Sequence, residues 1–403
     1  MTTPRVREAE PTAAEHRAEV RPRLRRGLRY CVAVFVAFRL GITVLEVAGV
    51  ALLPGLDPVG APGWPANETT PGWHNVVTSS ERFDALWFLS IATEGYRDGD
   101  GSAAFFPGYP LLIRAVTPLV GGHPLAAALL VSNLAALAAM VVLYFLTSSE
   151  FGEAAARRAV LYLAVFPTSF FLLAPYSEAP FLLFALLTLW AARRGRWEIA
   201  GVAGAAAAAT RNVGVLLVAP LLAEAVAQAD EERVSRARAV GWSLGPAVGT
   251  AAYLFFWWRF SGDWLAPLHQ QATWQREFLF PLGTLVAGTR EAFRFPGVYP
   301  GGYHLLDWLV AVPALAAAVW VAARTAVPYR LYTWLSILAP LSFVFIPRPF
   351  MSLPRFLLVV FPLLWAPAVL AERRPSVHGA TVAASSALLG IMTVLFAGWY
   401  YVF

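Results

Sequence analysis

The chain has 403 residues, of which 58% are hydrophobic and 14% are charged, and its formal net charge is +6. Soluble domains carry about 25% charged residues, so this composition favours a membrane protein. All 31 basic residues are arginines, but no basic surface interleaved with aromatic residues or nucleic-acid motif accompanies them, so we expect no nucleic-acid partner. A single cysteine, Cys31, excludes an intrachain disulfide.

Residues 1–26 are polar and charged, and they lack the apolar core of a signal peptide. We predict a disordered cytoplasmic tail here. Five arginines between residues 21 and 29 border the first apolar run, which favours a cytoplasmic N-terminus. Residues 27–403 then form a single integral membrane domain. The alanine-rich, lysine-free composition suggests GC-rich coding and a bacterial plasma (inner) membrane.

Apolar runs of about 20 residues recur along the chain and predict an all-α, polytopic transmembrane fold with about 11 crossings. Arginine-rich gaps between the runs are expected on the cytoplasmic side. Two long polar segments, residues 54–104 and 261–302, then lie outside. Residues 105–120 are predicted to lie on or dip into the outer face. Run 198–226 is too long for one span, and residues 210–214 are expected to break it into two short helices.

Three arginines depart from this charge pattern. Arg348 and Arg355 fall on the predicted outer side, and Arg211 lies inside an apolar hairpin. A charge inside a bilayer costs about 2.5–3.5 kcal/mol on insertion scales, so such residues usually face a cavity or a partner. Guanidinium groups bind phosphate oxygens in a forked geometry, which predicts an outer pocket for a lipid phosphate. The alternatives are ion pairs with Glu178 or Asp307, or snorkelling to lipid headgroups.

Asp84 lies in the first outer segment, next to the membrane. Arg82 would favour an ionised carboxylate there, while Phe83 and Trp87 would exclude water. A partly desolvated carboxylate takes a proton from an attacking hydroxyl, and with a lipid-phosphate leaving group the result is glycosyl transfer. Arg82 and Trp87 are therefore candidate substrate contacts. The alternative is that Asp84 only caps a helix beginning at Ala85.

Other chemistries have little support in the sequence. The six histidines are dispersed without metal-ligand spacing. Asp98 and Asp100 flank a glycine, a pattern typical of a turn as much as of a metal site. No phosphate-binding glycine motif or nucleophile elbow is present. We therefore expect no metal site and no cofactor.

Several short segments, in order, resemble one family. The chain is similar to the multi-pass mannosyltransferases related to the enzyme that adds the second mannose in GPI-anchor synthesis, whose bacterial relatives belong to the GT-C class of glycosyltransferases. The segments that carry the resemblance are residues 82–88, 95–96, 104–111, 166–171, 176–178, 210–214, 354–356 and 361–362.

The resemblance implies a polyprenyl-phosphate-mannose donor, used on the non-cytoplasmic face with inversion at the sugar carbon. It also implies that an acid in the first outer loop is the base, which maps onto Asp84, and that no metal is obligatory. Family members commonly have tryptophan before this acid, whereas this chain has Phe83. Tyr176 and Glu178, in an outer turn, are candidates for binding sugar or acceptor hydroxyls; the alternative is a carboxylate that stabilises a helix start.

Neither the acceptor nor the sugar follows from the resemblance. The acceptor is a lipid, a glycan or a protein, and the sugar is mannose, another hexose or a pentose. Two other functions remain open. A lipid transporter or flippase would also need buried arginines and a water-filled cavity, although no internal repeat of membrane topology is evident. A non-catalytic partner of another transferase would leave Asp84 dispensable.

Overall fold

The computed structural model describes residues 13–66, 72–231, 233–294 and 301–402. Within these ranges the structure is largely helical with almost no strand, which confirms the predicted all-α class. The two named strands of this part, β1 (Arg276–Phe278) and β2 (Phe343–Phe345), pair antiparallel. Arg276 lies opposite Phe345 in this register.

Six helical stretches in the described part are long and apolar enough to cross a membrane, so the protein is a multi-pass membrane protein. They are formed by α1 (Ala13–Leu52), α5 (Pro124–Phe151), η4 (Asn212–Leu217) with α9 (Val218–Asp230), α10 (Arg236–Ser243) with α11 (Gly245–Ser261), α14 (Gly301–Arg324) and α18 (Pro375–Ala397). Two shorter apolar stretches are α4 (Gly108–Val116) with η2 (Thr117–Val120), and α7 (Glu178–Ala192). The total of about 11 crossings stays a prediction.

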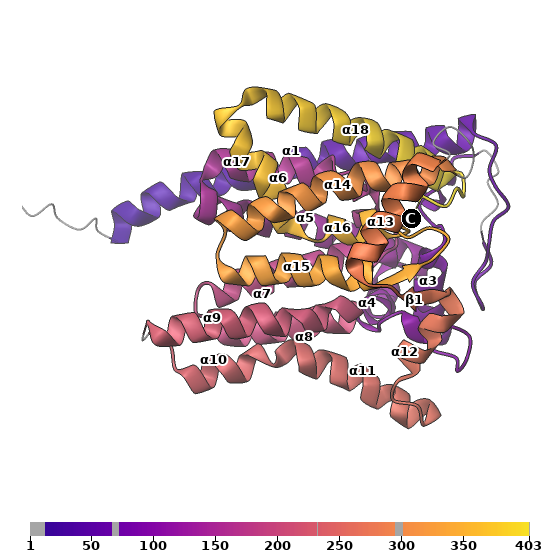
Figure 1. The fold of residues 1–403 in the computed structure, drawn as a ribbon, viewed down its shortest axis with the longest axis horizontal. Helices are drawn as coiled ribbons and strands as arrows, with labels where there is room; N and C mark the ends of the chain where they lie inside the picture. The colour runs from indigo at the N-terminus through magenta and orange to yellow at the C-terminus, as the bar shows by residue number, and fades with distance from the viewer. Residues whose placement is uncertain (1–12, 67–71, 232, 295–300, 403) are drawn as a thin grey trace, which may run out of the picture.

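The remaining helices are shorter, and among them α8 and α15 run within the bundle beside the long helices (Figure 1). They are α2 (Asn75–Thr78), α3 (Asp84–Glu94), η1 (Ser102–Ala104), α6 (Glu153–Ala164), η3 (Ser169–Leu172), α8 (Trp197–Thr210), α12 (Ala266–His269), η5 (Gln270–Trp274), α13 (Pro281–Arg294), α15 (Val327–Ser342), α16 (Leu353–Leu358), η6 (Phe361–Leu364) and α17 (Trp365–Arg373).

The N-terminal segment differs from the expected disordered tail, because α1 already begins at Ala13. Residues 13–26 therefore continue the first membrane helix, and residues 1–12 lie outside the described residues. Alanine, glutamate and arginine are good helix formers, so this composition extends a helix that is already nucleated by the apolar run.

Two apolar runs of the sequence, residues 158–174 and 355–371, do not form continuous helices and are interrupted near prolines. In the first run, helix α6 ends at Ala164, shortly before Pro167. The run from residue 355 to 371 is divided into α16, η6 and α17, with Pro362 inside η6. Proline lacks an amide donor and disfavours a helical residue before it, so both interruptions follow from the sequence.

The predicted break in run 198–226 is confirmed. Helix α8 ends at Thr210, and Arg211 adopts an extended conformation (φ −150°, ψ 145°) before η4 begins. Gly214 then approaches the backbone of Ala207 and Ala208 so closely that a Cβ atom would not fit. This close return of the chain projects Arg211 out of both helices.

The long helices run side by side, and the two polar segments meet at one end of the bundle (Figure 1). Helices α3, α4 and α12 and strand β1 gather at that end, opposite the start of α1. Gln270 Oε1 accepts a hydrogen bond from Ala103 N at 3.1 Å, and Tyr253 Oη donates one to Ala103 O at 3.0 Å. The first and second polar segments therefore form one cap over the bundle.

Arginines of several expected cytoplasmic gaps pair with acids of other helices. Arg193 binds Glu150 and Glu224, each at 3.2 Å, and Arg158 lies 3.4 Å from Glu372. These gaps belong to the end of the bundle where α1 starts (Figure 1). The arginine-rich gaps therefore share one end, as the charge pattern predicts.

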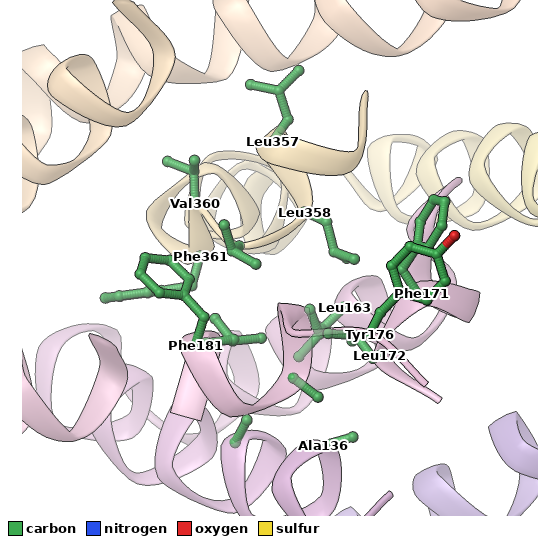
Figure 2. Packing of buried hydrophobic residues seen from close by; sticks show 14 of the residues in the cluster. Ala136, Leu163, Phe171, Leu172, Tyr176, Phe181, Leu357, Leu358, Val360 and Phe361 are labelled. Carbon is green, nitrogen blue, oxygen red and sulfur yellow. The ribbon is translucent and has the colours of Figure 1, made fainter. Parts of the chain in front are cut away.

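A buried apolar layer joins α16 and η6 to the α6–α7 region. Figure 2 shows Leu357, Leu358, Val360 and Phe361 on one side of this layer, facing Leu163, Leu172 and Phe181. All seven side chains are almost fully buried. Close packing of this kind fixes the relative position of the two segments, and each carries a charged residue at its beginning: Glu178 on α7 and Arg355 on α16.

Candidate active site

Asp84 is the first residue of α3 rather than the residue that caps it. Phe83 occupies the cap position with φ 54°, and its ring packs 5.1 Å from those of Trp399 and Tyr401. A positive φ is costly for a bulky residue and persists where the surroundings impose it. The aromatic cluster thus holds the turn before Asp84. The alternative that Asp84 caps a helix starting at Ala85 is wrong in this structure.

The Asp84 carboxylate instead joins a buried network of charges. Its Oδ2 accepts a hydrogen bond from Arg355 Nη1 at 2.6 Å, and Arg355 Nε lies 3.2 Å from Glu178 Oε1. Arg211 Nη1 donates to the same Glu178 oxygen and, at 3.2 Å, to Ser177 Oγ. The side chain of Glu178 is fully buried, and those of Arg211 and Arg355 are each 10% exposed. The predicted site residues Asp84, Glu178, Arg211 and Arg355 thus belong to one network.

Arg276 lies beside this network, although the sequence patterns do not assign it to the predicted phosphate pocket. Its Nη2 donates to Ser352 Oγ at 3.0 Å, and its Nη1 lies 3.4 Å from Phe343 O. Burial, followed by the charge of Arg355, lowers the pKa of Arg276 to about 10, against the opposing effect of Asp84. The pairing of β1 with β2 places Arg276 here, which no local sequence pattern indicates.

Three guanidinium groups share the ring of Phe356. The Cζ atoms of Arg211 and Arg355 each lie 5.4 Å from its centroid, and that of Arg276 lies 5.9 Å away. Cations are attracted to aromatic faces, so the ring supports part of this concentration of positive charge.

Arg348 is engaged by a partner of its own. Its Nε and Nη2 donate to the two carboxylate oxygens of Asp307 at 2.7 and 2.9 Å, and its Nη1 donates to Tyr401 O at 2.6 Å. Asp307 is fully buried. The structure therefore shows the ion pair with Asp307, the alternative role foreseen for Arg348, although Arg348 also borders the cavity described below.

Arg82 and Trp87 lie outside the cavity lining. Arg82 is fully buried, and its guanidinium donates to the carbonyls of Thr78, Glu81 and Ala397. Burial lowers its pKa to about 10 in spite of neighbouring acids. Trp87 stacks on Phe105 at 5.4 Å and meets Trp274 edge-on at 5.5 Å. Neither side chain therefore borders the cavity that lies beside Asp84, so their proximity to Asp84 in the sequence does not bring them to the same surface.

Tyr176 supports the site from within. Its hydroxyl donates to Arg82 O at 2.9 Å, and its ring lies 5.6 Å from the Arg355 guanidinium. It therefore links the turn before Asp84 to the Arg355 side of the network.

The network opens into a cavity of about 580 Å³ at the capped end of the bundle. Its wall combines charged, polar and aromatic side chains from the two polar segments, the α8–η4 break and the region around α16. These include Asp84, Phe88, Phe105, Phe106, Tyr176, Glu178, Arg211, Asn212, Gln271, Trp274, Arg276, Tyr303, His304, Arg348, Met351, Ser352, Arg355, Phe356 and Tyr401. Such a cavity suits a ligand with both a charged and an apolar part.

Among the described residues, no three histidine, cysteine, aspartate or glutamate side chains gather where they could hold a metal ion. Asp100 Oδ1 accepts a hydrogen bond from Ser102 N at 2.8 Å, an interaction typical of a turn.

Residues 62–234 match the family model described as Mannosyltransferase (PIG-V). This match confirms, over that range, the resemblance found in the sequence, and the matched family has the predicted enzyme class. The range includes Asp84, Glu178 and Arg211, whereas Arg276 and Arg355 lie beyond it. No curated protein matches the chain.

Solved structures show a partial likeness. The crystal structure of ArnT from Cupriavidus metallidurans bound to undecaprenyl phosphate has 19% identity and a TM-score of 0.47, covering 87% of this chain and 62% of that one. The oligosaccharyltransferase from Archaeoglobus fulgidus in its apo form has 12% identity and a TM-score of 0.43, covering 90% and 56%. The chain thus spans less than two thirds of either protein.

Proposed function

We propose that the protein is a membrane mannosyltransferase that moves a mannosyl group from polyprenyl-phosphate-mannose to an acceptor hydroxyl, with inversion, on the non-cytoplasmic face. The single observation that carries this proposal is the contact of Asp84 with Arg355 inside a cavity that also holds Glu178 and Arg211. A potential base and a cluster of guanidinium groups lie together, as a sugar phosphate and an acceptor require.

Asp84 acts as the general base. Arg355 binds its Oδ2, and within the described residues no side chain donates to Oδ1. An acceptor hydroxyl therefore has an oxygen to approach, while Arg355 keeps the carboxylate oriented. Asp84 takes the hydroxyl proton as the acceptor oxygen forms a bond to the anomeric carbon. The bond from that carbon to the phosphate oxygen breaks, and its electron pair leaves with polyprenyl phosphate.

Arg211 and Arg355 stabilise the departing phosphate. Both are held near Asp84 through Glu178, which is fully buried and contacts both guanidinium groups. Preorganised cations that meet developing negative charge lower the barrier without reorganisation at the moment of reaction. Glu178 thus serves as a positioning residue for two phosphate ligands.

The aromatic wall accommodates the apolar part of the substrates. Phe105, Phe106 and Trp274 line the cavity on the side of the two polar segments, and Trp87 supports Phe105 from behind. Aromatic faces suit both sugar rings and isoprenoid chains, so this wall fits a lipid-linked sugar.

The test is a transfer assay with purified full-length protein, radiolabelled polyprenyl-phosphate-mannose and candidate lipid, glycan and protein acceptors. We expect a mannosylated product whose anomeric configuration is opposite to that of the donor, and no transfer from a nucleotide-linked mannose. Retention of configuration, or label crossing a proteoliposome membrane without any new glycosidic bond, would contradict the proposal; the second result is the one expected of a flippase.

A further inference from the structure

Among the described residues, the guanidinium groups at the cavity wall outnumber by one the carboxylates that pair with or lie beside them. Arg211, Arg276, Arg348 and Arg355 line the cavity together with only two carboxylates, Asp84 and Glu178. The third carboxylate, Asp307, binds Arg348 in a two-pronged pair. Arg211 and Arg355 are paired with Glu178 and Asp84.

The excess charge belongs to Arg276. Among the described residues its hydrogen-bond acceptors are the Ser352 hydroxyl and the Phe343 carbonyl, both uncharged. Its side chain is partly exposed and borders the cavity, so a ligand can reach it. A partly buried charge without a carboxylate in direct contact is costly, and an anionic ligand would relieve that cost.

We propose that Arg276 is the docking site for the phosphodiester of the donor, an inference that rests on the proposed function. A phosphodiester carries one negative charge, which equals the excess at the cavity wall. Arg276, Arg211 and Arg355 all lie within 6 Å of the Phe356 ring, so one phosphate bound at Arg276 stays close to the two arginines assigned to the leaving group.

The balance of charges at the cavity wall also suits the product of transfer, polyprenyl phosphate. When Asp84 takes the proton its negative charge is lost, and Arg355 keeps only the Glu178 carboxylate as an opposite charge. The departing polyprenyl phosphate gains a second charge, since a phosphate monoester carries about −1.5 to −2 at pH 7. Arg355, which no longer pairs with a charged Asp84, can then bind the additional negative charge on the departing phosphate. Arg276 binds the phosphate both before and after transfer.

The test measures binding of radiolabelled polyprenyl-phosphate-mannose to the purified full-length protein without acceptor, for the wild type, Arg276→Gln and Arg276→Lys. Competition by unlabelled polyprenol and by an anionic phospholipid distinguishes the donor phosphate from the lipid chain and from a phospholipid headgroup. Arg290→Gln is the matched control, because Arg290 is an exposed arginine of the same polar segment that does not line the cavity.

We expect Arg276→Gln to weaken donor binding by about tenfold or more, as loss of a charged hydrogen bond does. Arg276→Lys retains part of the affinity, and Arg290→Gln binds as the wild type does. The unfolding temperature shows whether each variant is folded. If Arg276→Gln does not fold, the assignment is tested by donor binding to Arg276→Lys and by the salt dependence of donor binding to the wild type.

Equal donor affinity in the wild type and Arg276→Gln would overturn the assignment of Arg276 and leave the proposed function intact. The assignment would also be overturned if Arg276→Gln bound the donor as the wild type does and differed only in that anionic phospholipid no longer competed. Should the wild type bind the donor no better than polyprenol, the proposed function itself fails together with this inference.

Discussion

Arg355 Nη1 donates a hydrogen bond of 2.6 Å to Asp84 Oδ2, joining two residues that lie 271 positions apart in the sequence. Arg355 belongs to the short helix α16, and Asp84 begins α3 in the first polar segment. The contact therefore ties the first segment to the last third of the chain. It also means that a change at either residue alters the charge felt by the other.

Replacing Asp84 with asparagine should strengthen binding of the product. The substitution removes the charge paired with Arg355 while keeping the size of the side chain, as protonation would. We expect polyprenyl phosphate to bind Asp84→Asn about tenfold more tightly than it binds the wild type, equivalent to about 1.4 kcal/mol. Competition against labelled donor measures this; an unchanged or weaker affinity would argue against exchange of Arg355 from carboxylate to phosphate.

Arg211→Ala should raise the apparent donor KM by about tenfold or more, because a charged hydrogen bond to phosphate is lost. Glu178 keeps Arg355 as a partner in this variant, so folding should survive. Arg211→Lys keeps the positive charge but loses the forked geometry of the guanidinium group, so its donor KM should lie between those of the wild type and Arg211→Ala. Initial rates at varied donor concentration provide the measurement, and an unchanged donor dependence would assign Arg211 a structural role only.

Arg348→Ala should act chiefly on stability. Asp307 is fully buried, and removal of its partner leaves an uncompensated charge, a loss of about 3–5 kcal/mol in buried pairs. We expect a marked fall in the unfolding temperature in detergent. The double variant Arg348→Ala, Asp307→Ala should lose less than the two single variants added together; strict additivity would show that the pair does not interact.

Arg82→Ala should likewise lower the unfolding temperature, since three backbone carbonyls lose their donor. The donor KM of the folded fraction should stay within about twofold of the wild type, because Arg82 does not line the cavity. A tenfold rise in KM with normal stability would restore the substrate contact expected from sequence.

The helical fold and the grouping of Asp84, Glu178, Arg211 and Arg355 were predictable for a physical reason. Apolar runs, arginine-rich gaps and the break at residues 210–214 each have a local cause in composition, and charges placed against the membrane pattern need partners. The resemblance to the mannosyltransferase family pointed to the same short segments. Proline positions could have shown that the runs after residues 158 and 355 would break, but length and hydropathy alone did not.

The remaining assignments depend on contacts that no local pattern encodes. Arg276 reaches the cavity because β1 pairs with β2, which is 67 residues away at the Arg276–Phe343 contact. Arg82 and Asp84 are two positions apart, yet one faces the backbone of residues 78, 81 and 397 and the other faces Arg355. Side-chain direction at a strained turn is decided by packing, here around Phe83.

The most direct test of the account measures mannosyl transfer from radiolabelled polyprenyl-phosphate-mannose by Asp84→Asn beside the wild type, at matched protein and saturating donor. Asparagine cannot take the proton, so transfer should fall by at least about 10²-fold, within the range supplied by a general base, while donor binding and unfolding temperature are retained. Transfer at the wild-type rate by a folded, donor-binding Asp84→Asn variant would contradict the assignment of Asp84 as the base.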